Sequence, residues 1–199
     1  GEVQADRMRY LITGVTGCVG SHLADLLVER GDGEVHGLSR WRSSKEYIAP
    51  LLERGTITLV ECDLSDPISV LKAIDEVRPA VVFHAASQSY VGASYRRRTE
   101  TISTNGLGTV NLLEAIRYLR DDRGLRLDPI VHVVSSSEVY GKVEPEDCPI
   151  TETRPFNPTN PYAVSKCLAD VAASMYWKAH SVRTVRSRAF THSGPRRGQ

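Results

Sequence analysis

The sequence of 199 residues predicts an α/β protein with a doubly wound parallel sheet. Short β-branched runs alternate with longer amphipathic stretches along the chain, an order typical of parallel strands joined by helices. A glycine-rich stretch, TGVTGCVG, separates the first predicted strand from the first predicted helix. Because crossovers between parallel strands are right-handed, we expect the strand order 3-2-1-4-5-6, with helices on both faces of the sheet.

The first half of the chain is predicted to hold four strands and two helices. β-branched and apolar runs place the strands at 9–13, 34–39, 56–62 and 80–86. The first helix follows the glycine-rich stretch and stops at Gly31. Its apolar spacing predicts one shared helical face, made of Val19, Leu23, Leu26 and Leu27. The second helix, 67–77, begins at a proline and ends before Pro79.

The second half repeats the alternation with a helix at 101–120, a strand at 129–136, a helix at 161–180 and a strand at 181–190. Two glycines inside the helix 101–120 either allow close packing or reduce its stability. We expect residues 8–199 to form one domain, with 1–7 as terminal residues outside it. Because such sheets usually need a further lobe over their ligand, a C-terminal substrate lobe is expected to be missing from this chain.

Composition excludes several classes of function. Lys and Arg number 25 against 24 Asp and Glu, so bulk charge favours neither nucleic acid nor a membrane as partner. No apolar stretch approaches the ~20 residues of a membrane helix. The four cysteines are scattered, and His84, His132 and His192 lack metal-ligand spacing. We therefore expect a reduced, cytoplasmic protein without a metal site.

The glycine-rich stretch has the spacing of a dinucleotide-binding turn, with Gly14, Gly17 and Gly20 in the order G-x-x-G-x-x-G. The first glycine allows a tight turn, the second lets the backbone approach a diphosphate, and the third packs helix on strand. The amino terminus of the next helix favours the anion. Thr16 lies within the same turn and is counted with this cofactor site. The alternative is a glycine-rich turn without a ligand.

The segment after the second strand indicates which dinucleotide would bind. NAD-specific proteins carry an acidic residue there, whereas this chain has Ser39, followed by Arg40 and Arg42. Guanidinium and hydroxyl groups would hold a 2′-phosphate that a carboxylate would repel, so NADP is favoured over NAD. The alternative is that both arginines are solvated loop residues. Asp63 and Leu64, after the third strand, are candidates to hold the adenine ring.

A second group of polar residues predicts the reacting end of the site. Tyr162 and Lys166 stand four positions apart at the start of a helix, so they share one helical face. An ammonium near a phenol is expected to lower the phenol pKa towards neutrality, which makes it an acid or base. Ser136, at the carboxyl end of the fifth strand, is placed to meet the same substrate oxygen. The Tyr–Lys pair alone is common by chance. Chance is a poor explanation when the pair follows a glycine-rich turn and a serine-rich strand end, in this order along the chain.

These features resemble the extended short-chain dehydrogenase/reductase family over essentially Arg9 to Gln199. Within it, four motifs are most similar to the GDP-mannose 4,6-dehydratases and the GDP-4-keto-6-deoxyhexose reductases, namely SSSEVYGKV, PYAVSK, AASQSYV and RAFTHSGPRRGQ. The resemblance implies a Rossmann-type domain whose Ser136, Tyr162 and Lys166 form the catalytic triad. It also implies that Glu138 is the additional acid–base residue of the dehydratases, although some reductases carry an acid there as well.

The resemblance implies an NADP-dependent nucleotide-sugar 4,6-dehydratase that converts GDP-mannose to GDP-4-keto-6-deoxymannose. Two alternatives remain: a reductase or epimerase of the same fold, and a nucleotide-sensing module without turnover. Tyr162, Lys166, Ala85 and Ser87 are then expected to contact the cofactor. The expected substrate-binding residues are Ser87, Gln88, Ser89, Thr191, Arg196 and Arg197.

Thr191 departs from the family pattern, because the dehydratases usually carry Asn at this position. The resemblance also implies a homodimer, possibly extended to a tetramer, formed through the helices 101–120 and 162–180. Apolar side chains on the second face of both helices would exceed what one sheet can cover.

Overall fold

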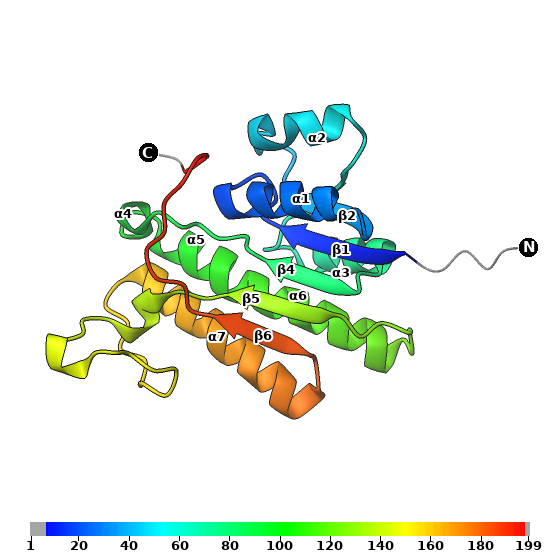
Figure 1. Cartoon of the computed structure of the whole chain (residues 1–199). Helices are drawn as coiled ribbons and strands as arrows, with labels where there is room; N and C mark the ends of the chain where they lie inside the picture. Colours follow the sequence, from blue (N-terminus) through cyan, green and yellow to red (C-terminus); the bar gives the residue numbers. More distant parts are fainter. Residues whose placement is uncertain (1–6, 198–199) are drawn as a thin grey trace, which may run out of the picture.

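The computed structural model describes residues 7–197, and these form a single six-stranded parallel sheet with helices on both sides (Figure 1). The strand order is β3-β2-β1-β4-β5-β6, as predicted, and every neighbouring pair is parallel. The strands are β1 (Met8–Thr13), β2 (Gly33–Ser39), β3 (Thr58–Glu61), β4 (Val81–His84), β5 (Ile130–Val134) and β6 (Thr184–Ser187). The doubly wound fold is therefore confirmed.

Helices of very different length connect these strands. The α-helices are α1 (Cys18–Arg30), α2 (Ala49–Glu53), α3 (Pro67–Val77), α4 (Val91–Ser94), α5 (Arg98–Ile102), α6 (Gly108–Arg117) and α7 (Pro161–His180). Short 3₁₀ turns add η1 (Glu46–Ile48), η4 (Ser137–Tyr140) and η5 (Pro145–Asp147). Two π-helical turns, η2 (Ser103–Leu107) and η3 (Tyr118–Asp122), follow α5 and α6. Within residues 7–197, none of the helices is both long enough and apolar enough to cross a membrane.

Two apolar clusters hold the helices to the sheet. The larger cluster lies beneath α3, α6 and α7 and includes Leu11, Val82, Leu112, Ile116 and Val131. The smaller cluster lies beneath α1 and α2 and includes Ile12, Val15, Leu27, Ile48 and Leu51. Burying apolar surface on both faces of β1 is what fixes this strand at the centre of the sheet.

The expected buried face of α1 is wrong in part. Val19 and Leu26 are 42% and 53% exposed, whereas the buried residues of this helix include Gly20, Ala24 and Leu27. The reason is the contact between Gly20 and the glycine turn, where an added Cβ would lie 2.2 Å from the Gly14 carbonyl oxygen. This close approach turns Gly20, Ser21 and Ala24 towards the sheet together with Leu27, and leaves Val19 and Leu26 exposed.

The predicted helix 101–120 is a helical run from α5 through η2 and α6 to η3, with local π geometry. Its two glycines serve close packing. A Cβ at Gly106 would lie 2.4 Å from Cδ2 of Leu168 on α7, and a Cβ at Gly108 would lie 3.1 Å from Cβ of Leu64. The run therefore contacts α7 more closely than side-chain packing alone would allow.

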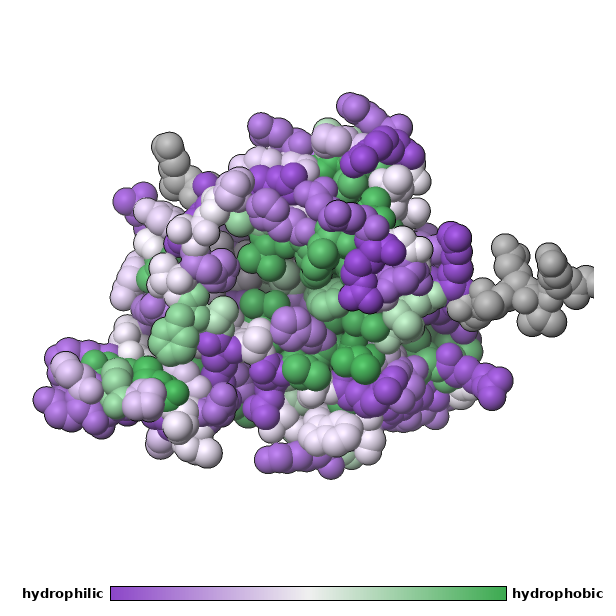
Figure 2. Space-filling view, viewed as in Figure 1, coloured by the Kyte–Doolittle hydropathy of each residue, from purple (hydrophilic) through white to green (hydrophobic). Residues whose placement is uncertain are grey.

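Half of one sheet face lacks a helical cover among the described residues. On β4, β5 and β6, alternate side chains point away from the α6–α7 layer, and Ile130 and Val185 among them are 39% and 55% exposed. Apolar side chains gather in this middle part of the molecule (Figure 2). An open apolar face of this kind is typical of a surface that contacts other protein.

Candidate active site

A cleft of about 970 Å³ opens at the carboxyl ends of the strands. The loops that follow β1 to β5 and the segment after β6 line it, which is where doubly wound sheets bind ligands. With the exception of Arg42, the cleft brings together every residue predicted for the site: Gly14, Thr16, Gly17, Gly20, Arg40, Asp63, Leu64, Ala85, Ser87, Gln88, Ser89, Ser136, Glu138, Tyr162, Lys166, Thr191, Arg196 and Arg197.

The glycine turn has the geometry of an anion-binding loop. Gly14 adopts a φ of +70°, and a Cβ there would lie 2.7 Å from the Ala86 Cα, so only glycine fits. Gly17 donates its N–H to the Gly14 carbonyl at 3.0 Å and is the N-cap of α1 without a side-chain cap. The first amides of α1 therefore have no side-chain partner and lie at the cleft, ready for an anionic group.

The two arginines after β2 lie in different surroundings. Arg40 lines the cleft near Asp63, whose pKa is lowered by hydrogen bonds from Ser65 and by the Arg40 charge. The Arg42 guanidinium instead stacks 4.8 Å from the ring centre of Trp41, which is 67% exposed. Arg42 therefore does not line the cleft, and its exposed side chain stacks on the indole instead.

Ser136, Tyr162 and Lys166 meet where β5 ends and α7 begins. Ser136 is the N-cap of η4, and its Oγ accepts the Glu138 N–H at 3.2 Å. Lys166 Nζ donates to the Val134 carbonyl at 2.8 Å and lies 5.8 Å from the Tyr162 ring centre. Burial lowers the Lys166 pKa from 10.5 to about 8, which still leaves the side chain mostly charged at neutral pH.

The pKa of Tyr162 is raised in this structure, contrary to the expectation that the lysine lowers it. Burial is the largest cause, and the negative charge of Glu138 adds to it. The nearby hydroxyls of Ser136 and Ser87 oppose the shift without reversing it. The Lys166 ammonium donates to a backbone carbonyl instead, so the phenol remains protonated at neutral pH in the ligand-free protein.

Glu138 lies on η4 and its side chain is exposed at the cleft. Its Oε2 accepts a hydrogen bond from Nδ2 of Asn160 at 2.9 Å. Asn160 was not predicted as a site residue. Its position directly before PYAVSK suggests only a helix cap, and its contact with Glu138 depends on the tertiary fold.

A buried polar network supports the loop after β4. His84 accepts or donates at both ring nitrogens, 2.8 Å from the Thr13 hydroxyl and 2.9 Å from the Thr109 hydroxyl. Burial lowers the pKa of His84 to about 3, so this side chain is neutral and structural.

Asn105 on η2, which sequence reasoning also missed, holds the loop after β4. It accepts the Gln88 N–H at 2.7 Å and donates to the Gln88 carbonyl at 3.2 Å. The π-helical turn is what aims this amide at the loop.

Two buried atoms in this loop have no hydrogen-bond partner among the described residues, the Ser87 hydroxyl and Oε1 of Gln88. Leaving such atoms buried and unpaired costs about 1–3 kcal/mol each, so they indicate a polar ligand in the cleft. Together with the glycine turn, they make the site fit a dinucleotide.

The segment after β6 closes one side of the cleft. Arg196 forms an ion pair with Asp25 of α1 at 2.6 Å, and the Pro195 carbonyl lies 3.1 Å from the His22 ring nitrogen. Arg197 bonds to the His192 carbonyl. Both arginines line the cleft. Each already has a partner within the protein, the Asp25 carboxylate for Arg196 and the His192 carbonyl for Arg197.

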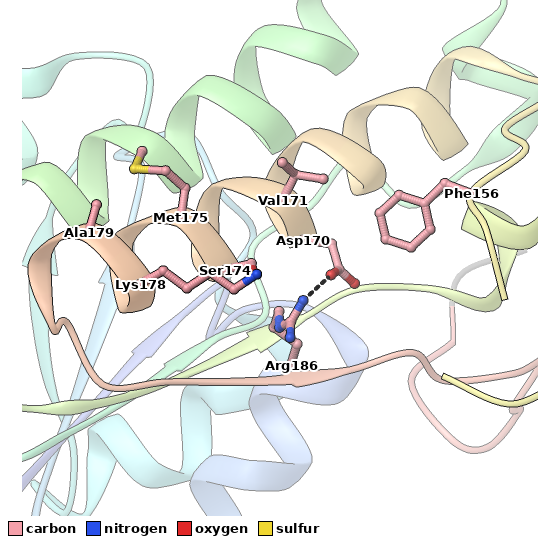
Figure 3. Close-up of a pocket in the computed structure, with 8 residues that line it drawn as sticks. All are labelled: Phe156, Asp170, Val171, Ser174, Met175, Lys178, Ala179 and Arg186. Carbon is pink, nitrogen blue, oxygen red and sulfur yellow. Dashed lines mark hydrogen bonds and ion pairs between the residues drawn. The ribbon is translucent and has the colours of Figure 1, made fainter. Parts of the chain in front are cut away.

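A second hollow lies along α7 beside β6 and contains none of the predicted site residues (Figure 3). Asp170, fully buried there, pairs with Arg186 at 2.9 Å and with Arg188 at 2.8 Å. Arg188 also donates to the Tyr140 hydroxyl at 2.9 Å. This network ties β6 and the turn η4 to α7, so its role is structural.

Comparison with known proteins places the chain in a family. Residues 11–199 match the family model described as GDP-mannose 4,6 dehydratase. The chain belongs to the GDP-mannose 4,6-dehydratase family. It is 36% identical to GDP-mannose 4,6-dehydratase of Vibrio cholerae over 97% of this chain and 52% of the relative. It is 35% identical to GDP-mannose 4,6 dehydratase of Homo sapiens over 100% of this chain and 54% of the relative.

Solved structures show that this chain of the GDP-mannose 4,6-dehydratase family shares its fold with related enzymes. The dTDP-glucose 4,6-dehydratase DesIV of Streptomyces venezuelae, solved with NAD, superposes with a TM-score of 0.84 at 27% identity, covering 96% of this chain and 58% of the other. UDP-glucose 4-epimerase of Brucella ovis, also solved with NAD, gives 0.78 at 28% identity, covering 92% and 52%. These neighbours confirm the extended short-chain dehydrogenase/reductase fold. The chain spans about half the length of the curated relatives it matches.

Proposed function

We propose that this chain is the cofactor-binding and catalytic part of a nucleotide-sugar 4,6-dehydratase that uses NADP and converts GDP-mannose to GDP-4-keto-6-deoxymannose. Residues 8–199 would be its NADP-binding domain. The observation that carries the proposal is the exposed carboxylate of Glu138 at the cleft, close enough for its charge to raise the Tyr162 pKa. Oxidation of a hydroxyl requires only the serine, tyrosine and lysine, whereas elimination of water also requires a base for the C5 proton.

The residues that would hold the cofactor are those of the glycine turn, Arg40 and the loop after β4. The amides at the start of α1 fit a diphosphate, and the unpaired Ser87 hydroxyl fits a polar group of the nicotinamide half. When bound, the oxidised cofactor supplies a hydride acceptor and a positive charge, which favours loss of the Tyr162 proton. NAD in two solved neighbours supports a nicotinamide dinucleotide, and Arg40 supports the phosphorylated form.

The protein groups would act in sequence on the hexose. Ser136 holds the 4-oxygen by a hydrogen bond while Tyr162 accepts the proton of the 4-hydroxyl, and Lys166 keeps a positive charge near the phenol. The resulting 4-ketone would acidify the C5–H bond, so Glu138 would remove the C5 proton while the proton held by Tyr162 leaves with the 6-hydroxyl as water. Glu138 would then return its proton to C5 as C6 is reduced. The nicotinamide dinucleotide would supply only the hydride acceptor and donor, so no net oxidation occurs.

A reductase or epimerase of the same fold is the second candidate, because UDP-sugar 4-epimerases are among the structural neighbours and Thr191 replaces the usual asparagine at the cleft. Such an enzyme would not need a carboxylate at position 138. The two functions therefore differ in what Glu138 does.

The test is Glu138→Gln in the full-length protein with GDP-mannose. The variant should still reduce bound cofactor, but product formation should fall at least ~100-fold, since an amide cannot take the C5 proton. Tyr162→Phe should abolish the reduction itself. Absorbance of the reduced cofactor follows both steps. The proposal fails if the wild-type protein only consumes added NADPH with a 4-keto-6-deoxy sugar and Glu138→Gln turns over normally.

A further inference from the structure

Asn160 connects the two halves of the candidate site through one side-chain amide. It stands directly before α7 and is 9% exposed. Its Oδ1 accepts the Ala163 N–H at 2.8 Å, which caps the helix that carries Tyr162 and Lys166. Its Nδ2 donates to Oε2 of Glu138 at 2.9 Å. Both functions of the amide are therefore used, one on each catalytic element.

The Glu138 carboxylate depends on this contact for its position. Among residues 7–197, Asn160 supplies the hydrogen bond that the carboxylate accepts, and it reaches only Oε2. Glu138 is otherwise exposed at the cleft, where a long side chain has several rotamers. Fixing one oxygen selects a rotamer and leaves Oε1 available to a substrate proton.

The chemistry of the donor suits a base. A lysine or arginine at this place would hold the carboxylate by an ion pair and make it a weaker base, because a nearby positive charge favours the deprotonated form. A neutral amide orients the group with a much smaller effect of that kind. Among the described residues, no lysine or arginine contacts the Glu138 carboxylate. The structure therefore orients this carboxylate by an amide hydrogen bond and not by an ion pair.

We propose that Asn160 is a positioning residue that sets the direction of Glu138 for removal of the C5 proton, an inference that rests on the proposed dehydratase function. It acts through Glu138 and through the cap of α7, so its two roles can be separated by substitution. Serine is a good N-cap but cannot donate to a carboxylate at the distance that Asn160 spans. Alanine removes both contacts.

The experiment compares Asn160→Ser with Asn160→Ala in the full-length protein, using rapid-mixing absorbance of the reduced cofactor with GDP-mannose. In Asn160→Ser, the reduction of cofactor should keep its wild-type rate. The later loss of the reduced form should slow about tenfold, the equivalent of one charge-assisted hydrogen bond. Reduced cofactor should therefore accumulate. Asn160→Ala should show the same kinetic defect together with a lower melting temperature, because the cap is lost as well.

A double-mutant cycle gives the decisive control. If Asn160 acts through Glu138, Asn160→Ser should cost nothing further in the Glu138→Gln background. Additive losses, or equal slowing of both steps in the single variant, would overturn the positioning role. Should Asn160→Ser fail to fold, Asn160→Asp keeps the cap and replaces the donor by a repelling carboxylate, so it should slow the second step still more.

The two proposals fail in different ways. A wild-type protein that never reduces cofactor with GDP-mannose would overturn the proposed function, and the role of Asn160 with it. A wild-type protein that dehydrates GDP-mannose, with an Asn160→Ser variant indistinguishable from it in both steps, would overturn the role of Asn160 alone.

Discussion

At the residue scale, Lys166 is the clearest case of a side chain whose functional position opposes stability. Its ammonium is buried with one hydrogen bond to a backbone carbonyl, and that burial lowers its pKa to about 8. The proposed reaction uses this buried charge. The free energy that the rest of the fold contributes must therefore offset the cost of burying it.

Replacing Lys166 by methionine should therefore stabilise the ligand-free protein at pH 7. The folded pKa of about 8 lies below the unfolded value of 10.5, so the unfolded chain binds the proton more tightly. The wild-type penalty, at most about 3 kcal/mol, is complete below pH 8 and fades as the pH rises towards 10.5. Urea denaturation of both proteins at pH 7 and pH 9.5 measures the difference. A variant that is less stable by the same amount at both values would contradict the prediction.

The two arginines after β2 should differ in their effect on cofactor choice. Arg40→Ala should weaken NADP(H) more than NAD(H), by about 1.5–3 kcal/mol if one charged hydrogen bond to the 2′-phosphate is lost. Arg42→Ala is the matched control and should change neither affinity much, because Arg42 stacks on Trp41 outside the cleft. Titration calorimetry with both dinucleotides measures this. Equal losses of the two cofactors in Arg40→Ala would remove the basis for NADP preference.

At the scale of the elements, prediction from the sequence was most accurate where neighbouring residues alone determine the bounds of a helix. Both α3 and α7 have the predicted bounds, since each begins with a proline after a side-chain cap, Asp66 or Asn160. The buried face of α1 was predicted less well, because the close approach of Gly20 to the Gly14 backbone determines which face of the helix is buried. Asn105 and Asn160 escaped prediction for a similar reason: their partners are distant in the sequence, and the amides meet them only after folding.

The close contact of the α5–η2 run with α7 gives a test of this packing. Gly106→Ala should lower the free energy of unfolding by about 1–3 kcal/mol, because the new Cβ would lie 2.4 Å from Cδ2 and 3.0 Å from Cγ of Leu168. Gly108→Ala, two residues further on, meets Leu64 at 3.1 Å and should change stability much less. Chemical denaturation of both variants makes the comparison. Equal effects would show that helix propensity, and not this contact, dominates.

At the scale of the whole molecule, the described residues leave two apolar surfaces open. One is the uncovered half-face of the sheet around Val185. The other is the outer stripe of α7, where Val164, Val171 and Met175 are 41%, 53% and 43% exposed at helical spacing. Self-association through the second surface remains a prediction, as does the cytoplasmic location.

The α7 stripe predicts a homodimer. Val171→Arg should convert the full-length protein to a monomer at micromolar concentration, since an unpaired charge would be buried in the interface. Val185→Arg, on the open sheet face, is the control and should leave the dimer intact. Light scattering distinguishes these states. A wild-type monomer, or a dimer that only Val185→Arg disrupts, would rule out assembly through α7.

The dehydratase function itself is tested most directly by following one hydrogen atom. If Tyr162 and Glu138 act as proposed, the full-length protein should take the hydride from C4 of GDP-mannose and return it to C6 of the same sugar. GDP-mannose with deuterium at C4 should therefore give a 4-keto-6-deoxy product that carries the deuterium at C6, detected by NMR. A product without deuterium at C6, or no product while added NADPH is consumed with a 4-keto-6-deoxy sugar, would contradict the account.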